Sequence, residues 1–256
     1  MRIATWNVNS VRVRLVQLLE WLARAAPDIV CLQETKCEDA RFPRAELEAA
    51  GYRCAFAGER AYNGVAILAR EDPADIQEGI GGFADGQKRV LAASVAGARV
   101  VCVYCPNGQA VGSDKYRYKL AWYAALKDHL AAELARHRAL VVAGDFNVAP
   151  EDRDVHDPAA REGEIHCSAP ERAAWRALLA LGLEDAFRLF PQPEKSYTWW
   201  DYRAGALRRN AGLRIDHILL SAPLARRCTA CSIDLAPRKL ARPSDHAPVL
   251  ADLAAA

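Results

Sequence analysis

Long hydrophobic runs are scarce in this sequence of 256 residues. The uninterrupted apolar stretches are short, for example Ala139 to Ala143, whereas a membrane-spanning helix needs about 20 apolar residues. The N-terminus reaches Trp6, Asn7 and Asn9 without the apolar run of roughly 7 to 15 residues that a secretory signal requires. We therefore expect no membrane span and a cytoplasmic location.

The sequence also lacks an excess of either charge. Lys and Arg number 34 against 32 Asp and Glu, a net charge of +2, so composition alone does not indicate a nucleic-acid partner. The 52% of hydrophobic residues is ample for a core and excludes a disordered or collagen-like chain. The charge is nevertheless uneven, with ten basic residues against four acidic ones from Lys195 to His246. Together with Lys115, Arg117 and Lys119, these cations predict surfaces that hold a phosphate backbone.

The eight cysteines lack the paired spacing of a zinc site. Cys31 and Cys102 lie inside apolar runs, where a reduced thiol packs as a small hydrophobic group. Cys228 and Cys231 have a zinc-type spacing, but no second pair of ligands follows them. We therefore interpret most cysteines as packing residues.

No linker rich in Pro, Ser or Gly divides the chain. The length would suit two small domains, but one compact α/β domain over residues 1–256 is the simplest interpretation. Short runs rich in Val, Ile and Leu, bounded by turn residues, predict buried or half-buried strands. They are Arg2 to Asn7, Asp28 to Glu34, Gly64 to Ala69, Val90 to Val95, Arg99 to Tyr104, Leu140 to Phe146, Leu213 to Ser221 and His246 to Leu253.

Three segments have a helical pattern. Val11 to Ala25 ends before a proline, and Tyr116 to Arg136 has an apolar stripe at spacings of three and four. Pro170 to Leu181 has Ser168 as a candidate cap and Gly182 just past its end. The stripe consists of Leu120, Tyr123, Leu126, Leu130 and Leu134.

A weak internal echo links the two halves of the chain. Ile3 to Val8 resembles Val142 to Val148, because each is an apolar strand that opens onto an Asn-Val pair. The echo is too short to establish a repeat. It suits two sheets stacked face to face with converging strand ends.

Polar and ionisable side chains recur at or near the ends of the apolar runs. A carboxylate beside a core strand is costly unless it is hydrogen-bonded, paired or metal-bound. Taken alone, Glu34 would be a solvated strand end and His246 a buried structural histidine. Together, the set indicates one polar site at the edge of the sheets. It comprises Asn7, Glu34, Tyr104, Asp145, Asn147, Asp216, His217, Asp245 and His246.

The residue types also narrow the chemistry. Carboxylates and amides without a cysteine partner suit a hard divalent cation such as Mg²⁺ or Mn²⁺, which takes oxygen ligands and bridges to phosphate. An Asp near a His can orient the imidazole for work on a phosphate or a proton. The sequence has no Gly-rich phosphate loop with its Lys, which disfavours a nucleoside triphosphatase. Hydrolysis of a phosphate ester is therefore the favoured reaction.

Seven short segments carry most of these residues. They are Trp6 to Asn9, Leu32 to Lys36, Tyr104 to Gly108, Gly144 to Asn147, Tyr197 to Arg203, Leu213 to His217 and Ser244 to Pro248. In this order they resemble the signature of the exonuclease III family of DNA-repair nucleases. Any one segment would be weak evidence, but the ordered set covers nearly the whole chain and makes the resemblance specific.

The resemblance implies a fold and an activity. The fold would be a DNase I-like, four-layered α/β sandwich of two packed mixed β-sheets flanked by helices. The activity would be hydrolysis of double-stranded DNA by a monomer with Mg²⁺ or Mn²⁺. The family cuts beside abasic sites, clears blocked 3′ ends and removes nucleotides in the 3′ to 5′ direction. The balance among these activities and the number of metal ions stay open.

The resemblance also implies roles for the acidic residues. Glu34 would be the principal metal ligand, with Asn7 beside it and Asp245 nearby. The metal would neutralise a phosphate oxygen and the charge that develops on the leaving oxygen. Asp145, held by Asn147, would orient or deprotonate the attacking water. The family has competing assignments of the general base, so this role stays open.

Other residues would bind the substrate. His246, paired with Asp216, would bind the scissile phosphate and stabilise its transition state, and Tyr104 would contact the same phosphate. His217 would be a supporting or structural residue, and Trp199, which alone would suggest a core residue, would line the pocket for a displaced sugar. Further substrate-binding candidates are Asn107, Lys119, His166 and Leu213.

Two positions depart from the pattern of abasic endonucleases. Asn9 stands where some members have Asp, which would weaken metal affinity. His166 lies in the loop that enters the third helix, where its imidazole would project into the nucleotide pocket. It would then block an extrahelical abasic sugar but admit a frayed 3′ terminus; a histidine on a surface loop is the alternative interpretation.

Two other functions fit parts of the pattern. A phosphatase of the same fold, acting on inositol phosphates or sphingolipids, would share the metal and histidine framework, but the segments around Tyr104 and Trp199 favour the DNA branch. A catalytically inactive DNA-binding module would be expected to lack Glu34, Asp145 or His246, and all three are present.

Overall fold

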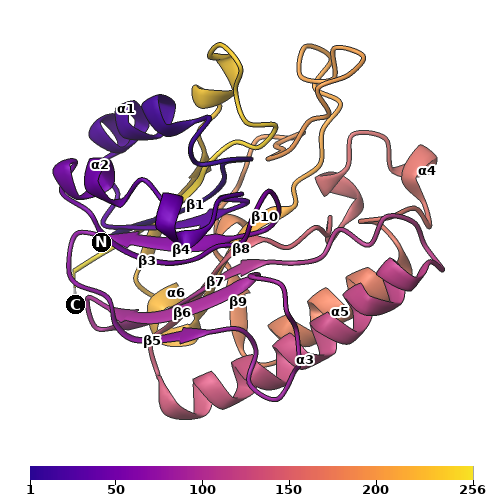
Figure 1. Ribbon diagram of the computed structural model, residues 1–256. Helices are drawn as coiled ribbons and strands as arrows, with labels where there is room; N and C mark the ends of the chain where they lie inside the picture. Colours follow the sequence, from indigo (N-terminus) through magenta and orange to yellow (C-terminus); the bar gives the residue numbers. More distant parts are fainter. Residues whose placement is uncertain (256) are drawn as a thin grey trace.

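The computed structural model describes residues 1–255 and has two six-stranded sheets that stack face to face (Figure 1). In spatial order, the first sheet consists of β11 (Cys228–Ile233), β12 (Val249–Leu253), β1 (Arg2–Asn7), β2 (Ile29–Gln33), β4 (Val65–Ala69) and β3 (Arg53–Ala57). The second consists of β5 (Ala74–Glu78), β6 (Val90–Val95), β7 (Ala98–Tyr104), β8 (Leu140–Asp145), β10 (Asp216–Ser221) and β9 (Leu183–Asp185).

Helices cover the outer face of each sheet. Helices α1 (Leu15–Ala25) and α2 (Arg44–Ala49) pack on the first sheet, and α3 (Asp114–Arg136) and α5 (Ala169–Leu179) on the second (Figure 1). Two shorter helices, α4 (Pro158–Arg161) and α6 (Ala222–Ala225), lie in connections. These four layers confirm the predicted sandwich of two mixed sheets between helices. None of the helices within residues 1–255 combines the length and apolar character needed to cross a bilayer.

Apolar side chains fill the three spaces between the layers. Ile3, Ile67, Leu91 and Val100 belong to the cluster between the sheets, and all four are fully buried. Burial of one such side chain contributes roughly 1.5 to 3 kcal/mol to folding. A second cluster fixes α1 and α2 on the first sheet, and a third fixes α3 and α5 on the second. The sheets are therefore a firm support for the loops at their ends.

Strand register aligns the polar residues at one end of the sheets. In the second sheet, Asp145 is paired with Tyr104 of parallel β7 on one side and with Asp216 of antiparallel β10 on the other. In the first sheet, Asn7 is paired with Gln33, which precedes Glu34. The predicted convergence of strand ends from two stacked sheets is confirmed.

The first predicted helix begins four residues later than expected, at Leu15 rather than Val11. The backbone before it is held by the loop after β2, because Ser10 N donates to Glu34 O at 2.7 Å and Val11 N to Thr35 O at 3.1 Å. These hydrogen bonds replace the first turn of a helix and bring the two loops together.

Two predicted strands are shorter than expected. The strand predicted from Leu213 begins at Asp216, and the strand predicted from His246 begins at Val249, after Pro248. Leu213 and His246 instead form isolated bridges with Trp199. The chain therefore carries these residues in loops that cross the end of the sandwich.

Candidate active site

Asn7 connects the two sheets at the end of the sandwich. Its Nδ2 donates to Glu34 Oε1 at 2.8 Å and to Asp145 Oδ2 at 3.0 Å, and its Oδ1 accepts from Asn9 N at 3.0 Å. The amide therefore presents its nitrogen to both carboxylates. In this arrangement the amide nitrogen of Asn7 orders the two carboxylates, and the ligand role that the resemblance implied for Asn7 stays a prediction.

His246 lies between two carboxylates. Its Nδ1 is 2.9 Å from Asp216 Oδ2, and its Nε2 is 3.8 Å from Asp145 Oδ2. Burial alone would lower the pKa of His246, but Asp216 and Asp145 outweigh it and raise the pKa to about 10. The imidazole is therefore protonated at neutral pH and acts as a buried hydrogen-bond donor. The predicted pairing of His246 with Asp216 is present.

Two hydroxyl groups hold the backbone of Asp216 and His246. Thr198 Oγ1 accepts from the backbone N of Asp216 at 3.1 Å, and Ser244 Oγ accepts from the backbone N of His246 at 3.2 Å. Ser244 Oγ also donates to Asn7 O at 2.6 Å. Both residues lie in segments that the sequence singled out, but a lone Ser or Thr gives no signal of such a role.

Asp145 is buried and its carboxylate is held by Asn147, whose backbone N donates to Oδ1 at 2.9 Å. Burial raises the pKa of Asp145 to about 7, Asp216 pushes it the same way, and the His246 cation opposes the shift. A carboxylate with a pKa near neutrality suits proton transfer at physiological pH.

Within residues 1–255, one set of three His, Cys, Asp or Glu side chains has all its possible metal-ligand atoms within 4.8 Å of one another. It consists of Glu34, Asp145 and His246. Because His246 is protonated, the two carboxylates are the better donors for a cation. Burial alone would raise the pKa of Glu34, but Lys36 and Asn7 reverse the shift and keep it below its usual value. The ionised oxygens of Glu34 are donors that a hard divalent cation prefers.

Asp245 lies at the side of this group, with its own partners. Its Oδ1 accepts from Asn9 Nδ2 at 2.9 Å and its Oδ2 from Trp199 Nε1 at 3.0 Å. Lys36 Nζ donates to Asn9 Oδ1 and lies 2.6 Å from both this oxygen and Glu34 Oε2. Asp245 is therefore linked to Glu34 through Asn9 and Lys36, and it holds Trp199 in place.

A second polar group contains Asn107, Asn147 and His166. Asn107 Nδ2 donates to Asn147 Oδ1 at 3.2 Å and lies 3.4 Å from His166 Nε2. His166 Nδ1 is 2.8 Å from Asn147 O. The histidine is buried, so the alternative of a surface-loop histidine is wrong. Its ring lies against the residue that holds Asp145.

Leu213 and Trp199 form part of an apolar cluster next to this group. Leu213 is buried with Val155 and Cys167, and the half-buried Trp199 packs against them. The backbones of Trp199 and Leu213 are joined by two hydrogen bonds of 2.9 and 3.0 Å. The structure thus brings the two predicted pocket residues together beside His166.

The charge count treated Lys119 and Arg214 as surface cations, but both are buried. Lys119 is fully buried, and its Nζ donates to Asn107 O, Asn147 O and Glu171. Arg214 is also buried and is paired with Asp154 and Asp185. Both lie next to apolar residues in the sequence, but only the partner carboxylates, which are distant in sequence, explain their burial.

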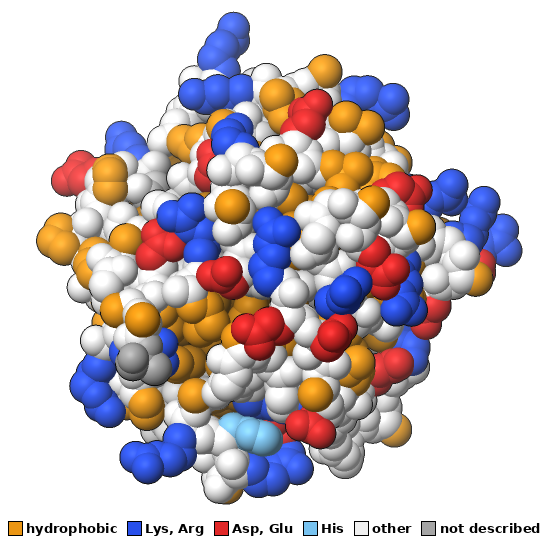
Figure 2. Space-filling model, turned by 90° about the vertical axis from the view of Figure 1, so that its left-hand side faces the viewer, with side chains coloured by type: hydrophobic (Ala, Val, Ile, Leu, Met, Phe, Trp, Pro, Cys, Tyr) orange, Lys and Arg blue, Asp and Glu red, His pale blue; other side chains and the backbone are white. Residues whose placement is uncertain are grey.

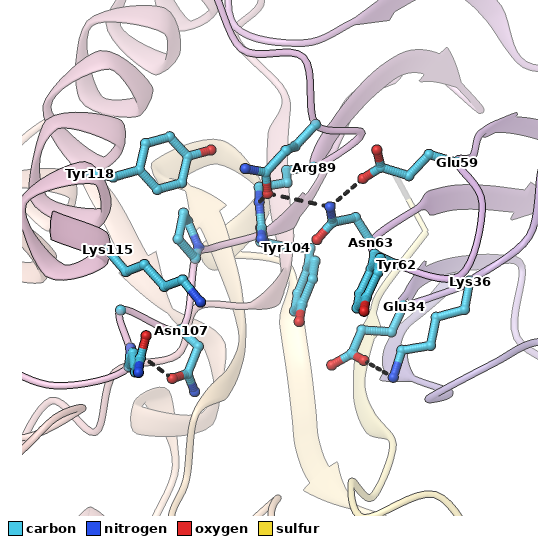
Figure 3. Close-up of a pocket in the computed structure, with 14 residues that line it drawn as sticks. Glu34, Lys36, Glu59, Tyr62, Asn63, Arg89, Tyr104, Asn107, Lys115 and Tyr118 are labelled. Carbon is cyan, nitrogen blue, oxygen red and sulfur yellow. Dashed lines mark hydrogen bonds and ion pairs between the residues drawn. The ribbon is translucent and has the colours of Figure 1, made fainter. Parts of the chain in front are cut away.

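A cavity of about 730 Å³ opens beside Glu34 and Tyr104. Figure 3 shows Glu34, Tyr104 and Asn107 around it, with Arg89 next to Tyr104. The Arg89 guanidinium lies 4.7 Å from the centre of the Tyr104 ring. Lys115 also lines the cavity, as its place in a predicted phosphate-binding surface implied. Residues of the lining that sequence reasoning missed are Glu59, Tyr62, Asn63, Gln87 and Arg89.

The side of the molecule that lies at the left of Figure 1 carries charges of both signs. Figure 2 shows Lys and Arg side chains intermixed with Asp and Glu on this face. It therefore offers no continuous basic surface for a phosphate backbone.

Comparisons with known proteins agree with this geometry. The sequence model of the endonuclease/exonuclease/phosphatase family matches residues 4–246. Exodeoxyribonuclease III of Haemophilus influenzae is 34% identical over 265 aligned residues, which cover 98% of this chain and 99% of that protein.

Two solved structures are similar over their whole length. A 3′ phosphatase from Neisseria, bound to a product DNA hairpin, has a TM-score of 0.98 and 46% identity, with 100% of both chains covered. An AP endonuclease from Archaeoglobus fulgidus has a TM-score of 0.96 and 40% identity, again over 100% of both chains. These likenesses confirm the predicted fold and do not favour the inositol phosphate or sphingolipid alternative. The chain belongs to the endonuclease/exonuclease/phosphatase family and, within it, to the exonuclease III group of DNA-repair nucleases.

Proposed function

We propose that this protein is a metal-dependent phosphodiesterase that removes nucleotides or blocking groups from the 3′ ends of double-stranded DNA. The observation that carries the proposal is the position of the His246 cation between Asp145 and Asp216, with Glu34 beside them. An acid-base pair next to a carboxylate cation site meets the needs of phosphate-ester hydrolysis.

Glu34 would be the principal ligand of Mg²⁺ or Mn²⁺, because its ionised oxygens are the donors that these ions prefer. Such an ion, when bound, neutralises phosphate charge and stabilises the leaving oxygen. We keep Asn7 and Asp245, the other predicted ligands, as residues that order Glu34 and the neighbouring loop.

The remaining roles follow from proton positions. Asp145 accepts the proton of the attacking water, since its pKa lies near neutrality and Asn147 fixes its orientation. His246 donates from Nε2 to a phosphate oxygen while Asp216 holds Nδ1. Tyr104 and Asn107, on the wall of the cavity, contact the phosphate or its neighbours.

His166 sets the choice between DNA substrates in this proposal. Its buried ring lies against Asn147 and Asn107, beside the apolar cluster of Leu213 and Trp199. An abasic sugar displaced from a continuous strand would meet this ring, whereas a terminal nucleotide can fray and approach from the open end. The enzyme then prefers 3′ ends to internal abasic sites.

The His166→Gly variant tests this preference. We expect it to raise incision at an internal abasic site by about tenfold, because the ring that excludes the sugar is gone, while removal of a 3′ terminal nucleotide changes little. Both rates are measured as kcat/KM on matched labelled duplexes. Equal changes on both substrates would remove the proposed role of His166.

Release of phosphate from an inositol polyphosphate, without shortening of DNA, would overturn the proposal as a whole.

We further propose that the protein acts as a monomer in the cytoplasm. Its eight cysteines are free thiols, a state that a reducing compartment maintains.

A further inference from the structure

A buried ion pair joins α3 to α5 directly behind His166. Lys119 of α3 and Glu171 of α5 are both fully buried, with exposed fractions of 0%. Two charges removed from water are stable only when hydrogen bonds satisfy them fully. The partners that satisfy this pair are therefore informative.

Lys119 uses all three of its donors. Its Nζ donates to Glu171, to Asn147 O at 2.6 Å and to Asn107 O at 3.1 Å. A lysine ammonium has three hydrogens, so none is left over. Burial lowers the pKa of Lys119, and the Glu171 carboxylate opposes that shift. The ammonium thus fixes the backbone of the two asparagines that surround the His166 ring.

Glu171 divides its two oxygens between a cap and His166. Its Oε2 accepts from Ser168 N at 3.2 Å and from Ser168 Oγ at 2.5 Å, which completes the capping box at the start of α5. Its Oε1 accepts from Lys119 and from His166 N at 3.0 Å. Capping of α5 uses only Oε2, whereas Oε1 binds the backbone N of His166.

His166 needs such support because of its backbone. Its φ angle is 73°, a conformation that is strained for any residue with a Cβ. The bond from His166 N to Glu171 holds the backbone, and the contact of Nδ1 with Asn147 O, which Lys119 also holds, orients the ring. Both of these contacts of His166 thus trace to the same ion pair.

We propose that the Lys119–Glu171 ion pair is a positioning device that keeps the His166 ring in the substrate pocket and so sets the ratio of 3′-end removal to internal incision. This inference rests on the proposed role of His166. Neither member of the pair touches the reacting atoms.

A purely structural role would predict a different result. In that case the pair would hold α3 to α5, and its loss would reduce stability and slow both reactions together. A matched control is available at the far end of α3, where Glu133 is fully buried and accepts from Arg99 Nε at 2.6 Å. Glu133→Gln disrupts a comparable buried pair that has no contact with His166.

The test uses four variants of the full chain: Glu171→Gln, His166→Gly, the two combined, and Glu133→Gln. Gln retains an acceptor for the cap of α5 but removes the charge and one of the two acceptor oxygens. For each variant, kcat/KM is measured on a 3′-recessed duplex and on an internal abasic duplex. The ratio of the two values cancels any reduction that both substrates share.

We expect Glu171→Gln to lower this ratio by about tenfold, because a displaced ring no longer blocks the pocket. In the His166→Gly background, Glu171→Gln should leave the ratio unchanged, because the ring is absent and Gly accepts the positive φ without strain. Glu133→Gln should leave the ratio at its original value.

Three results would overturn the inference. The ratio could be unaffected by Glu171→Gln while His166→Gly lowers it; this outcome spares the role of His166 but removes that of the pair. An undiminished effect of Glu171→Gln in the His166→Gly background would show that the pair acts elsewhere. If His166→Gly itself leaves the ratio unchanged, the role of His166 fails and this inference fails with it.

Should Glu171→Gln not fold, the Lys119→Met/Glu171→Gln double variant removes both charges and leaves no unpaired buried ion. It is expected to lower the ratio in the same way, and an unchanged ratio would again contradict the proposal.

Discussion

Several residues of the site have a backbone conformation that is rare outside glycine. Glu34, Asn147 and His166 have φ angles of 51°, 50° and 73°. Each such angle costs about 1 to 3 kcal/mol and persists only where the surroundings enforce it. Hydrogen bonds to neighbouring loops and carboxylates do so here. Strain at these positions re-aims three side chains at the end of the sandwich.

Much of the site could be predicted at the residue scale, because its members sit at strand ends. Glu34, Asp145, Asp216 and His246 do lie together as the segments indicated. The orientation of a side chain is a different matter. The sequence could not show that the amide of Asn7 presents its nitrogen, because Asn9 N, a backbone group, decides it.

The protonation of His166 leads to a test of pH dependence. Burial, aided by the Lys119 charge, lowers the pKa of His166 to about 3, against about 6.5 in an unfolded chain. The folded ring therefore stays neutral at and above roughly pH 5. We expect the ratio of 3′-end removal to internal incision to be constant from about pH 5 to about pH 9, measured as kcat/KM on both duplexes.

A step in that ratio near a pH of about 6.5, the ordinary pKa of histidine, would show that the ring titrates in contact with water and would contradict the buried position. The sign for stability follows from the same shift. Between the unfolded pKa and the folded one, the unfolded chain binds a proton that folded His166 refuses. This residue therefore makes the protein less stable as the pH falls through that window.

At the scale of elements, the central strands and the three long helices could be predicted, and the edges could not. Strand β4 is a continuous run of apolar residues, and β6 and β8 consist mostly of them. Edge strand β5 is mostly exposed and β9 has only three residues, so neither has an apolar pattern to detect. Strand β3, at an edge of the first sheet, is half-buried and likewise gave no signal.

The buried face of α3 shows why an apolar stripe is an incomplete guide. Tyr123, Leu126 and Leu130 are buried as the stripe indicated, but so are Lys119 and Glu133. Their partners lie on α5 and β7. A charged residue inside a core can be predicted only when its distant partner is known.

The loop before α4 should depend on one buried aspartate. Asp154 is fully buried, accepts from Arg214 Nε at 2.6 Å and is also paired with Arg188. Asp154→Ala leaves a buried guanidinium with half its partners, so we expect the free energy of unfolding to fall by about 3 to 5 kcal/mol. Urea unfolding at neutral pH measures it.

Asp152, two residues earlier, is the matched control, since its pair with Arg172 is exposed on the acid side. Asp152→Ala should change the free energy of unfolding by less than about 1 kcal/mol. A similar small change for Asp154→Ala would mean that the buried network does not stabilise this loop.

At the scale of the whole molecule, the net charge is near neutral, but acidic and basic residues lie in different places. Of the ten cations between Lys195 and His246, Arg214 and Arg238 are buried, and the other eight remain at least partly exposed. The acids of the site lie inside the sandwich end, while these cations lie on the loops around residues 195 to 242. The total of +2 is therefore a poor guide to the DNA-binding surface.

Salt dependence checks this distribution. If Arg208 and Arg209 each neutralise a phosphate of the DNA backbone, replacing both with Ala should reduce the slope of log Kd against log salt concentration by about 0.9 per phosphate. Binding is measured with a catalytically inactive Asp145→Asn chain by fluorescence anisotropy. Arg44→Ala, which removes an exposed cation of α2 that is paired with Glu48, should leave the slope unchanged. A slope altered equally by both changes would contradict the assigned surface.

The central claim is that a cation held at Glu34, beside the base Asp145, supports hydrolysis of DNA from its 3′ end. The most direct measurement follows a 5′-labelled duplex with a recessed 3′ end at single-nucleotide resolution, with Mg²⁺ or with EDTA. We predict stepwise shortening with Mg²⁺, none with EDTA, and a decrease in rate of about 10²- to 10⁴-fold in Asp145→Asn. Shortening that persists in EDTA, or an Asp145→Asn chain as active as the original, would contradict the account.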